Sequence, residues 1–373
     1  MLSDLPNLLP PYKLHGKYYW AVGDQTELWD ALRRFTRSTL KTDHLPFSIT
    51  KSGAPIKTAW ESEEYDHLAN FFLVFDIWMD LYQPGCRYSP DVELFFSYVA
   101  TSKIGEIRRV TALGKNNIDD ATRQAPLYNE LIQAIRFKAR EGRLSRKLAT
   151  LRATVPEQER SIECYLRALS SRYKVLRFNR LDHFYEKSPF DVADGLERLP
   201  WGGKSREIIR QNNFNENWID QPETRGRIDV KTIIGHRNAF FGTRDREEAY
   251  LGYLSKVERG GSHGAFHMHT LLIYDGSRVR DNQLEALADL DARLWGEITG
   301  GTGLSYNCKS RRDIGYLMQT NRWALDPLNE GDELALTRLV EYCRYFSDDK
   351  GQMPLVKPSQ KSNLMTKGHF PKR

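Results

Sequence analysis

The chain has 373 residues, of which 40% are hydrophobic, and its 55 Lys and Arg residues exceed its 49 Asp and Glu residues by a formal charge of +6. This length and composition predict a globular protein with two domains. The absence of a run of about eighteen apolar residues excludes a spanning helix, so no membrane partner is expected. The first residues lack the pattern of a signal peptide, and we therefore expect a cytoplasmic protein. The mild positive charge permits a polyanionic partner without requiring one.

The first part of the chain is predicted to be mainly helical. Residues 1–60 contain several prolines and little periodicity, so we expect irregular backbone with short elements there. Residues 63–82 carry apolar side chains at helical spacing and predict a core helix. Ser89, Pro90 and Asp91 are typical of the first turn of another helix. We interpret residues 1–165 as a mainly α-helical region whose expected role is to bind DNA or a partner protein.

Residues 125–151 predict one long helix in which basic side chains accumulate with few acidic ones. Two interpretations remain open for this basic face. It is either a solvated surface that keeps the protein soluble or a surface that contacts the phosphates of nucleic acid. The candidate DNA-binding residues on it are Arg136, Arg140 and Arg143.

Strands dominate the prediction after residue 165. Apolar or alternating runs predict strands at residues 173–181, 228–234, 250–257, 265–274 and 304–309. A glycine-bearing turn joins the third and fourth of these into an antiparallel hairpin. Helical periodicity predicts helices at residues 281–299, 312–319 and 333–346, with Asp281 as an N-cap. The order predicts an α+β domain over residues 166–373, with an antiparallel sheet and helices packed on one face.

The four cysteines, Cys86, Cys164, Cys308 and Cys343, lie far apart and form no Cys-x-x-Cys pair. This spacing argues against a zinc ribbon and against a disulfide framework. We interpret them as ordinary buried thiols.

The strand at residues 265–274 contains His267 and His269, separated by one residue. Side chains alternate between the two faces of a strand, so both imidazoles point the same way and one cation can meet both rings. The alternative interpretation is that the rings only bond a carboxylate or a carbonyl group.

Glu258 is the nearest candidate for a third metal ligand, on the preceding strand. If Glu258 pairs with His267, the three side chains share one face, but the turn sets this register and the sequence leaves it open. The alternative is a charge at a strand end in solvent. Two imidazoles and a carboxylate leave coordination positions free and favour Mg²⁺ or Mn²⁺, which can polarise a phosphoryl oxygen.

A nucleophile for such a site is expected among the tyrosines downstream. In a helix at residues 333–346, Tyr345 lies about half a turn from the apolar stripe, and Tyr342 lies on a neighbouring polar sector. Tyr316 has the same character in the preceding helix. A phenolate can form a stable phosphoester, although each tyrosine is equally interpreted as a side chain that covers the rim of the core.

The order of these motifs resembles the HUH endonucleases and, within them, the inovirus-type rolling-circle replication initiators. The resemblance extends from the strand that contains Arg177 to the C-terminal tail, and it does not include the N-terminal region. Residues 345–350 resemble the tyrosine segment of that family. The family usually has a lysine three residues after the tyrosine, where this chain has Asp348 and carries Lys350 further on. Tyr316 and Tyr342 therefore remain alternatives to Tyr345.

The resemblance implies an RRM-like sheet and a defined activity. A cation held by Glu258, His267 and His269 would align a phosphate of single-stranded DNA at a replication origin. Attack by Tyr345 would then give a 5′-phosphotyrosine and a free 3′-hydroxyl that primes a host polymerase, with a host helicase as a further partner. This chemistry initiates rolling-circle replication of a phage, plasmid or integrated element. Further candidate DNA contacts are Arg177, Lys309, Arg311 and Arg312.

Two alternatives to this activity are kept. A mobilisation relaxase or a transposase uses the same site chemistry. A catalytically inactive DNA-binding protein would keep the fold without the reaction.

Overall fold

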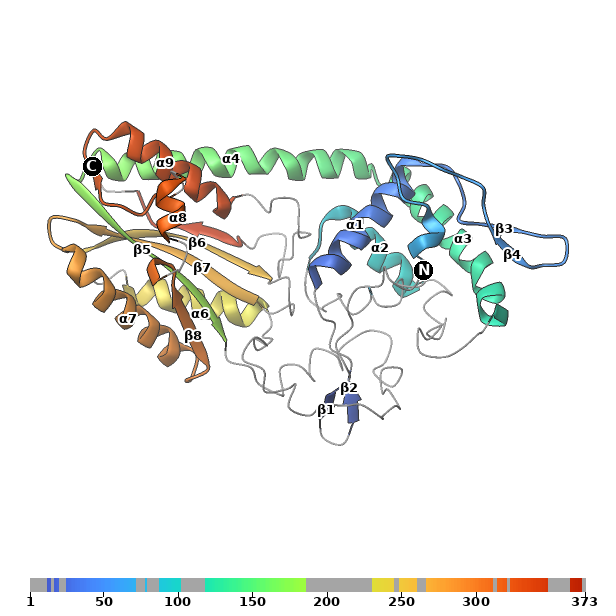
Figure 1. Ribbon diagram of the computed structural model, residues 1–373, viewed down its shortest axis with the longest axis horizontal. Helices are drawn as coiled ribbons and strands as arrows, with labels where there is room; N and C mark the ends of the chain where they lie inside the picture. Colours follow the sequence, from blue (N-terminus) through green and yellow to red (C-terminus); the bar gives the residue numbers. More distant parts are fainter. Residues whose placement is uncertain are drawn as a thin grey trace.

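In a computed structural model of the chain, the described residues are 12–14, 17–19, 25–71, 78, 87–101, 118–185, 230–244, 248–259, 266–310, 314–320, 323–347 and 363–370. The molecule is elongated, with a helical N-terminal end, a sheet-bearing C-terminal end and one long helix running between them (Figure 1). Among the described helices, none combines the length and the apolarity needed to cross a bilayer.

The N-terminal end is built on helices that bury aromatic side chains. Its main helices are α1 (Gln25–Lys41), α2 (Pro90–Thr101) and α3 (Ile118–Glu141). Phe35 of α1 meets Phe95 of α2 edge-on at 5.7 Å between ring centroids, which is a favourable aromatic geometry. The shorter elements here are β1 (Tyr12–Leu14), β2 (Lys17–Tyr19), β3 (Phe47–Ile49), β4 (Pro55–Lys57) and the 3₁₀ helix η1 (Leu68–Phe71).

Two predictions for this end need correction. α1 is a helix of 17 residues inside the segment for which we predicted irregular backbone. Its buried positions follow helical spacing, but Thr36 and Thr39 are among them, and threonines add little to an apolar pattern. In the segment predicted as a helix at residues 63–82, residues 63–67 are not helical and residues 68–71 form the short η1, and beyond these the structure describes only residue 78. The helix start predicted around Pro90 is confirmed by α2.

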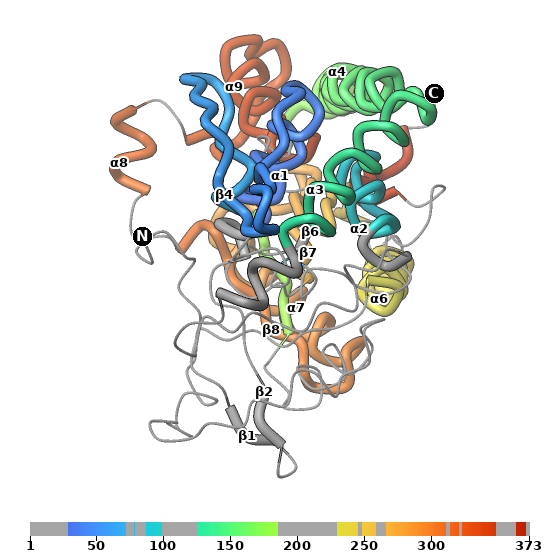
Figure 2. The backbone as a smooth tube through the Cα atoms, turned by 90° about the vertical axis from the view of Figure 1, so that its right-hand side faces the viewer, coloured from blue at the N-terminus to red at the C-terminus, as the bar shows by residue number. Residues whose placement is uncertain are grey.

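The predicted helix at residues 125–151 is two helices. α3 ends at Glu141, and α4 (Leu144–Ser170) begins after Gly142 and Arg143. Arg143 has φ 50°, the left-handed conformation that ends a helix and that few non-glycine residues adopt. The predicted domain boundary near residue 165 lies inside α4, because this helix continues onto the sheet. Figure 2, along the long axis, shows α1 to α3 in front and α4 receding behind them.

The C-terminal end contains a six-stranded antiparallel sheet of order β10-β6-β7-β5-β8, in which β9 also pairs with β5. This arrangement confirms the predicted α+β class. The strands are β5 (Val175–Tyr185), β6 (Tyr250–Arg259), β7 (Phe266–Asp275), β8 (Gly303–Asn307), β9 (Leu328–Asn329) and β10 (Met365–Lys367).

Helices cover both faces of the sheet, so the prediction of helices on one face is wrong. α6 (Val230–Arg244) and α7 (Asp281–Ile298) lie below the sheet in Figure 1, whereas α4 and α9 (Glu333–Cys343) lie above it. β7 shows the reason. Its residues are buried from Phe266 to Tyr274 without alternation, and a strand that is apolar on both sides needs cover on both. The 3₁₀ helices η6 (Cys308–Ser310) and η7 (Arg344–Phe346) and the short α8 (Ile314–Gln319) complete this end.

Other expectations for this end are adjusted by the structure. The strand predicted at residues 228–234 is wrong, because residues 230 onward form α6. β-branched residues suggested a strand there, but Ile233, Arg237 and Phe240 are buried at helical spacing.

Asp281 was predicted as the N-cap of a helix, but it is the first residue of α7, with Arg280 as its N-cap. Cys308 and Cys343 are buried as expected, but Cys164 is exposed; Cys86 and the turn at residues 260–265 lie outside the described residues.

Candidate metal centre

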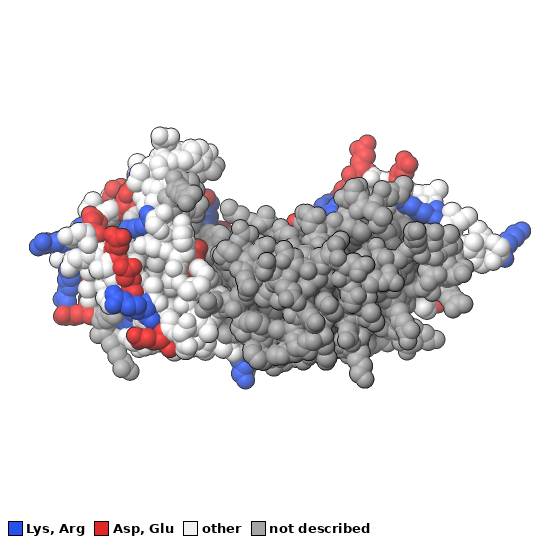
Figure 3. Space-filling model, turned by 60° about the horizontal axis from the view of Figure 1, so that its bottom comes forward, with Lys and Arg blue, Asp and Glu red and all other residues white. Residues whose placement is uncertain are grey.

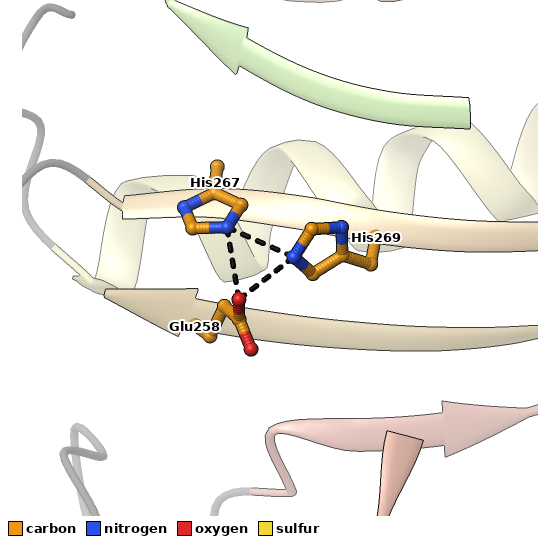
Figure 4. A group of neighbouring side chains, drawn as sticks. All are labelled: Glu258, His267 and His269. Atoms are coloured by element: carbon orange, nitrogen blue, oxygen red, sulfur yellow. Dashed lines mark hydrogen bonds and ion pairs between the residues drawn. The ribbon is translucent and has the colours of Figure 1, made fainter. Parts of the chain in front are cut away.

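The hairpin of β6 and β7 places three candidate ligands on one face of the sheet. Glu258 pairs with His267, which confirms the register that would bring them together. The side chains of His267 and His269 project on the face that α4 and α9 cover, as do Leu271 and Ile273 of the same strand. Figure 4 shows the two imidazoles and the carboxylate turned toward one another.

The spacing of the ligand atoms suits one small cation. His267 Nε2 lies 3.0 Å from Glu258 Oε1, His269 Nε2 lies 2.7 Å from the same oxygen, and the two nitrogens are 2.9 Å apart. A cation about 2.1 Å from three ligands at right angles to one another separates those ligands by about 3.0 Å. Glu258, His267 and His269 are therefore a group that could hold a metal ion.

Asp182 of β5 orients one of these imidazoles. It pairs with His269 in the register of β5 and β7, and its Oδ1 lies 2.5 Å from His269 Nδ1. An ionised carboxylate only accepts hydrogen bonds, so Nδ1 carries the proton, and Nε2 would present its lone pair to a bound cation. This carboxylate–histidine arrangement is the usual support of a metal-binding imidazole.

Tyr345 reaches the centre from the segment that follows α9. Asp332 caps α9 by accepting a hydrogen bond from the Ala335 amide at 2.9 Å, and the helix then packs its apolar side against the sheet. η7 continues α9 and buries Phe346, which leaves the adjacent Tyr345 over the histidines. Its ring lies 5.0 Å from that of His269, edge to face.

The Tyr345 hydroxyl contacts two of the three candidate ligands. It donates to Glu258 Oε1 at 2.6 Å and lies 2.7 Å from His269 Nε2. The other two predicted tyrosines are placed differently. Tyr342 lies on α9, and burial is the main cause that raises its pKa; Tyr316 is 59% exposed on α8. Among the described residues, the structure brings only Tyr345 of these three tyrosines into contact with the metal centre.

Two buried cations flank Tyr345. Lys256 Nζ lies 3.2 Å from Glu258 Oε2 and donates to the Tyr345 carbonyl oxygen at 3.3 Å, so it connects the carboxylate to the backbone of η7. The Arg180 guanidinium lies 2.9 Å from Asp182 Oδ1 and 5.6 Å from the centre of the Tyr345 ring. Each carboxylate of the site thus has one fixed cation beside it.

The protonation states follow from these contacts. Burial alone would raise the pKa of Glu258, but hydrogen bonds with His267 and His269 outweigh it and hold this pKa well below its usual range. Burial acts in the same direction on Asp182, and its hydrogen bond with His269 and the charge of Arg180 lower its pKa strongly. Burial and the neighbouring Glu258 raise the pKa of Tyr345 far above that of a free phenol. Both carboxylates are therefore ionised at neutral pH, and the phenol is neutral.

The four fixed charges around the candidate centre cancel one another. The ionised Glu258 and Asp182 offset Lys256 and Arg180, because each carboxylate has a cation within 3.2 Å. A divalent cation on the three candidate ligands would leave the site with excess positive charge. Such a site attracts a phosphodiester and stabilises a phenolate beside it.

Not all predicted DNA contacts lie near this centre. Arg177 projects from the opposite face of the sheet, because it is an odd number of residues from Asp182 on the same strand, and it pairs with Asp281. Lys309 follows β8 in η6, and burial lowers its pKa. Arg311 and Arg312 lie outside the described residues.

The candidates on α3 and α4 lie at the other end of the bridging helix. Arg136 is buried and donates to the carbonyl oxygens of Thr39, Asp43 and His44 at 2.8, 3.1 and 2.9 Å. It therefore serves the packing of α3 against α1 rather than a phosphate contact. Arg140 is exposed and lies 3.3 Å from Asp43, and Arg143 is exposed between α3 and α4.

Three residues of the centre were not found from the sequence, namely Asp182, Arg180 and Lys256. Arg180 and Asp182 are separated by one residue, so their side chains lie on the same face of the strand. Two opposite charges on one face of a mainly apolar strand could have indicated that these residues belong to a site. Their relation to His269 depends on the register between β5 and β7, and the pattern of either strand alone does not contain it.

Comparison of the chain with known proteins finds no matching family model, no matching curated protein and no matching solved structure.

Proposed function

We propose that this protein is a metal-dependent endonuclease and strand transferase for single-stranded DNA, of the HUH type, that initiates rolling-circle replication of a phage, plasmid or integrated element. One observation carries the proposal. A tyrosine hydroxyl contacts Glu258 Oε1 and His269 Nε2 at 2.6 and 2.7 Å, within a group that could hold a metal ion. A nucleophile beside a group that could hold a cation suits covalent phosphoryl transfer, because the cation would neutralise charge at the phosphoryl oxygen that the nucleophile approaches.

Each residue has a distinct part in this reaction. Glu258, His267 and His269 would hold Mg²⁺ or Mn²⁺, which supplies charge neutralisation at a phosphoryl oxygen. Asp182 keeps His269 in the tautomer whose Nε2 faces the centre. Lys256 and Arg180, at 5.0 and 5.6 Å from the Tyr345 ring, offset the negative charge of the phenolate.

The bond changes balance without a further reactant. The Tyr345 phenol loses its proton to solvent, and its oxygen forms a bond to the phosphorus of the scissile phosphodiester. The bond from phosphorus to the 3′ oxygen of the preceding nucleotide breaks, and that oxygen takes up a proton. The products are a 5′-phosphotyrosine and a free 3′-hydroxyl, and attack of such a hydroxyl on the phosphotyrosine reverses the step and transfers the strand. The 3′-hydroxyl is the primer that a host polymerase, with a host helicase, would extend.

Covalent capture tests this proposal. The protein is incubated with Mn²⁺ and labelled single-stranded oligonucleotides of varied sequence, and SDS-resistant adducts are measured. We expect an adduct with the native protein, and we expect none with Tyr345→Phe or with His267→Ala and His269→Ala combined.

Tyr316→Phe is the matched control, because this tyrosine is 59% exposed on α8, and it should form the adduct normally. An undiminished adduct in Tyr345→Phe would remove Tyr345 as the nucleophile. Binding of the oligonucleotides without any adduct would instead identify a DNA-binding protein that lacks the reaction.

A further inference from the structure

We propose that the bend between α3 and α4 binds the phosphate backbone of double-stranded DNA and that α4 holds this site at a fixed distance from the metal centre. We call residues 138–147 the basic elbow. The inference rests on the proposed function only for the choice of DNA as the polyanion.

The charge of the elbow is almost entirely positive. Its cations are Lys138, Arg140, Arg143, Arg146 and Lys147, and its single acid, Glu141, bonds Lys138 at 2.5 Å. Residues 142–156 contain no Asp or Glu. Arg143, Arg146 and Lys147 are exposed, and within the described ranges they have no acidic partner. An exposed group of cations without acids is the composition that releases counterions from a nucleic acid.

The backbone brings these cations to one side. Arg146 and Lys147 follow Arg143 by three and four residues, which is the spacing of neighbours on a helix surface, and their amides both bond the Arg143 carbonyl oxygen. The left-handed conformation of Arg143 turns the chain sharply at this point. The long basic side chain is therefore held at the apex of the bend, at a backbone position that would suit glycine better.

The packing of α3 against α1 makes the elbow a fixed surface. Arg136 holds it from within, because its guanidinium donates to the carbonyl oxygens of Thr39, in the last turn of α1, and of Asp43 and His44, which follow that helix. The C-terminal end of α1, with Lys41, is thereby held against α3 just before the elbow. The sheet-bearing end differs: on the face in Figure 3, its described acidic and basic side chains are interspersed.

α4 then sets the distance to the sheet. Its first residue that packs in the core of the sheet is Ile162, 18 positions after Leu144. At 1.5 Å per residue this part of the helix measures about 27 Å, which is the length of about eight base pairs. Figure 1 shows α4 crossing from the elbow to the sheet as one straight element. A rigid spacer suits a duplex, which is also rigid, whereas a flexible single strand adapts to any spacing.

The experiment measures the salt dependence of affinity for a DNA duplex that continues into a single strand. Fluorescence anisotropy is recorded over a range of NaCl concentrations without divalent metal, so the reaction itself does not contribute. With Arg143→Gln, Arg146→Gln and Lys147→Gln combined, we expect the slope of log K against log salt to become shallower by about 2.7, or about 0.9 for each lost contact. The affinity for a single strand should change much less.

A matched control replaces three exposed cations of the sheet-bearing end, Arg172→Gln, Lys174→Gln and Arg293→Gln, and should leave the slope unchanged. Thermal unfolding checks that both variants are folded. An unaltered slope in the elbow variant, or no duplex binding by the native protein, would overturn the inference. If the elbow variant loses as much affinity for single-stranded DNA as for the duplex, the duplex site would be replaced by a stacking surface for single strands. The same loss of affinity in Phe137→Ala would support that outcome, because Phe137 is 63% exposed beside the elbow.

The inference and the proposed function fail separately. If the salt dependence of duplex affinity becomes shallower in the elbow variant while the native protein forms no covalent adduct, the duplex site is supported and the nicking activity is not. If the native protein forms the adduct and the salt dependence is the same in both proteins, the nicking activity is supported and the duplex site is not.

Discussion

Asp182 determines which nitrogen of His269 faces the candidate metal centre. Without the carboxylate, either nitrogen of a neutral imidazole can carry the proton, and the ring is free to turn. The short contact from Asp182 to Nδ1 fixes both the tautomer and the ring plane. Arg180 bonds Asp182 in turn, and its charge adds to the hydrogen bond with His269 in lowering the pKa of this carboxyl group. At this scale, the geometry of one ligand depends on a pair of residues that never touch the cation.

We expect Asp182→Asn to weaken Mn²⁺ binding by about 10-fold to 100-fold, because residues that support a metal-binding imidazole have effects of this size. Isothermal titration calorimetry on the metal-free protein measures the affinity. Asp289→Asn, an exposed position on α7, is the matched control and should bind Mn²⁺ normally. If the Asp182 variant bound Mn²⁺ as tightly as the native chain, His269 would not depend on this carboxylate.

At the scale of elements, Arg136 shows how a basic residue in a helical pattern is misinterpreted. The sequence placed it on a basic face together with Arg140 and Arg143. The structure turns it toward α1, where carbonyl oxygens in and just after the last helical turn need donors. The pattern of α3 alone does not contain this information, because it depends on which helix packs against α3.

Replacement of this residue should therefore affect stability rather than DNA binding. We expect Arg136→Met to lower the free energy of unfolding by about 2–3 kcal/mol, because buried carbonyl oxygens lose charged donors that the apolar chain does not replace. Urea unfolding at neutral pH measures this loss. The salt dependence of duplex affinity, measured on the folded variant, should match that of the native protein. A stable variant with a shallower slope would return Arg136 to the DNA-binding surface.

Elements with strong local patterns could be predicted from the sequence, and elements shaped by packing could not. The hairpin of β6 and β7 was found, because β7 is a long apolar run and a glycine-rich sequence separates it from β6. α6 was predicted as a strand because Val230, Ile233 and Ile234 favour strands locally, and its helical form is set by packing beneath the sheet. The break at Arg143 was missed because nothing in the residue type indicates a left-handed backbone.

At the scale of the whole molecule, the candidate centre is assembled from three distant parts of the chain. Tyr345 is 87 positions from Glu258, and His269 is 87 positions from Asp182. The two histidines could be predicted to share a face because only the period of one strand matters. Glu258 required the hairpin register, Asp182 required the pairing of β5 with β7, and Tyr345 required the packing of α9 on the sheet. The position of each of these three residues in the site therefore depends on a contact between elements that the sequence of one element does not contain.

The position of a cation bound between these three parts can be measured directly. Crystals grown with Mn²⁺ and a short single-stranded oligonucleotide give an anomalous signal that locates the metal without reference to activity. We predict one strong Mn²⁺ peak about 2.1–2.2 Å from Glu258 Oε1, His267 Nε2 and His269 Nε2, with the Tyr345 oxygen next to a phosphate of the oligonucleotide. Bound Mn²⁺ at another position, or histidines that remain bonded only to Glu258 and Asp182 at saturating Mn²⁺, would contradict the account.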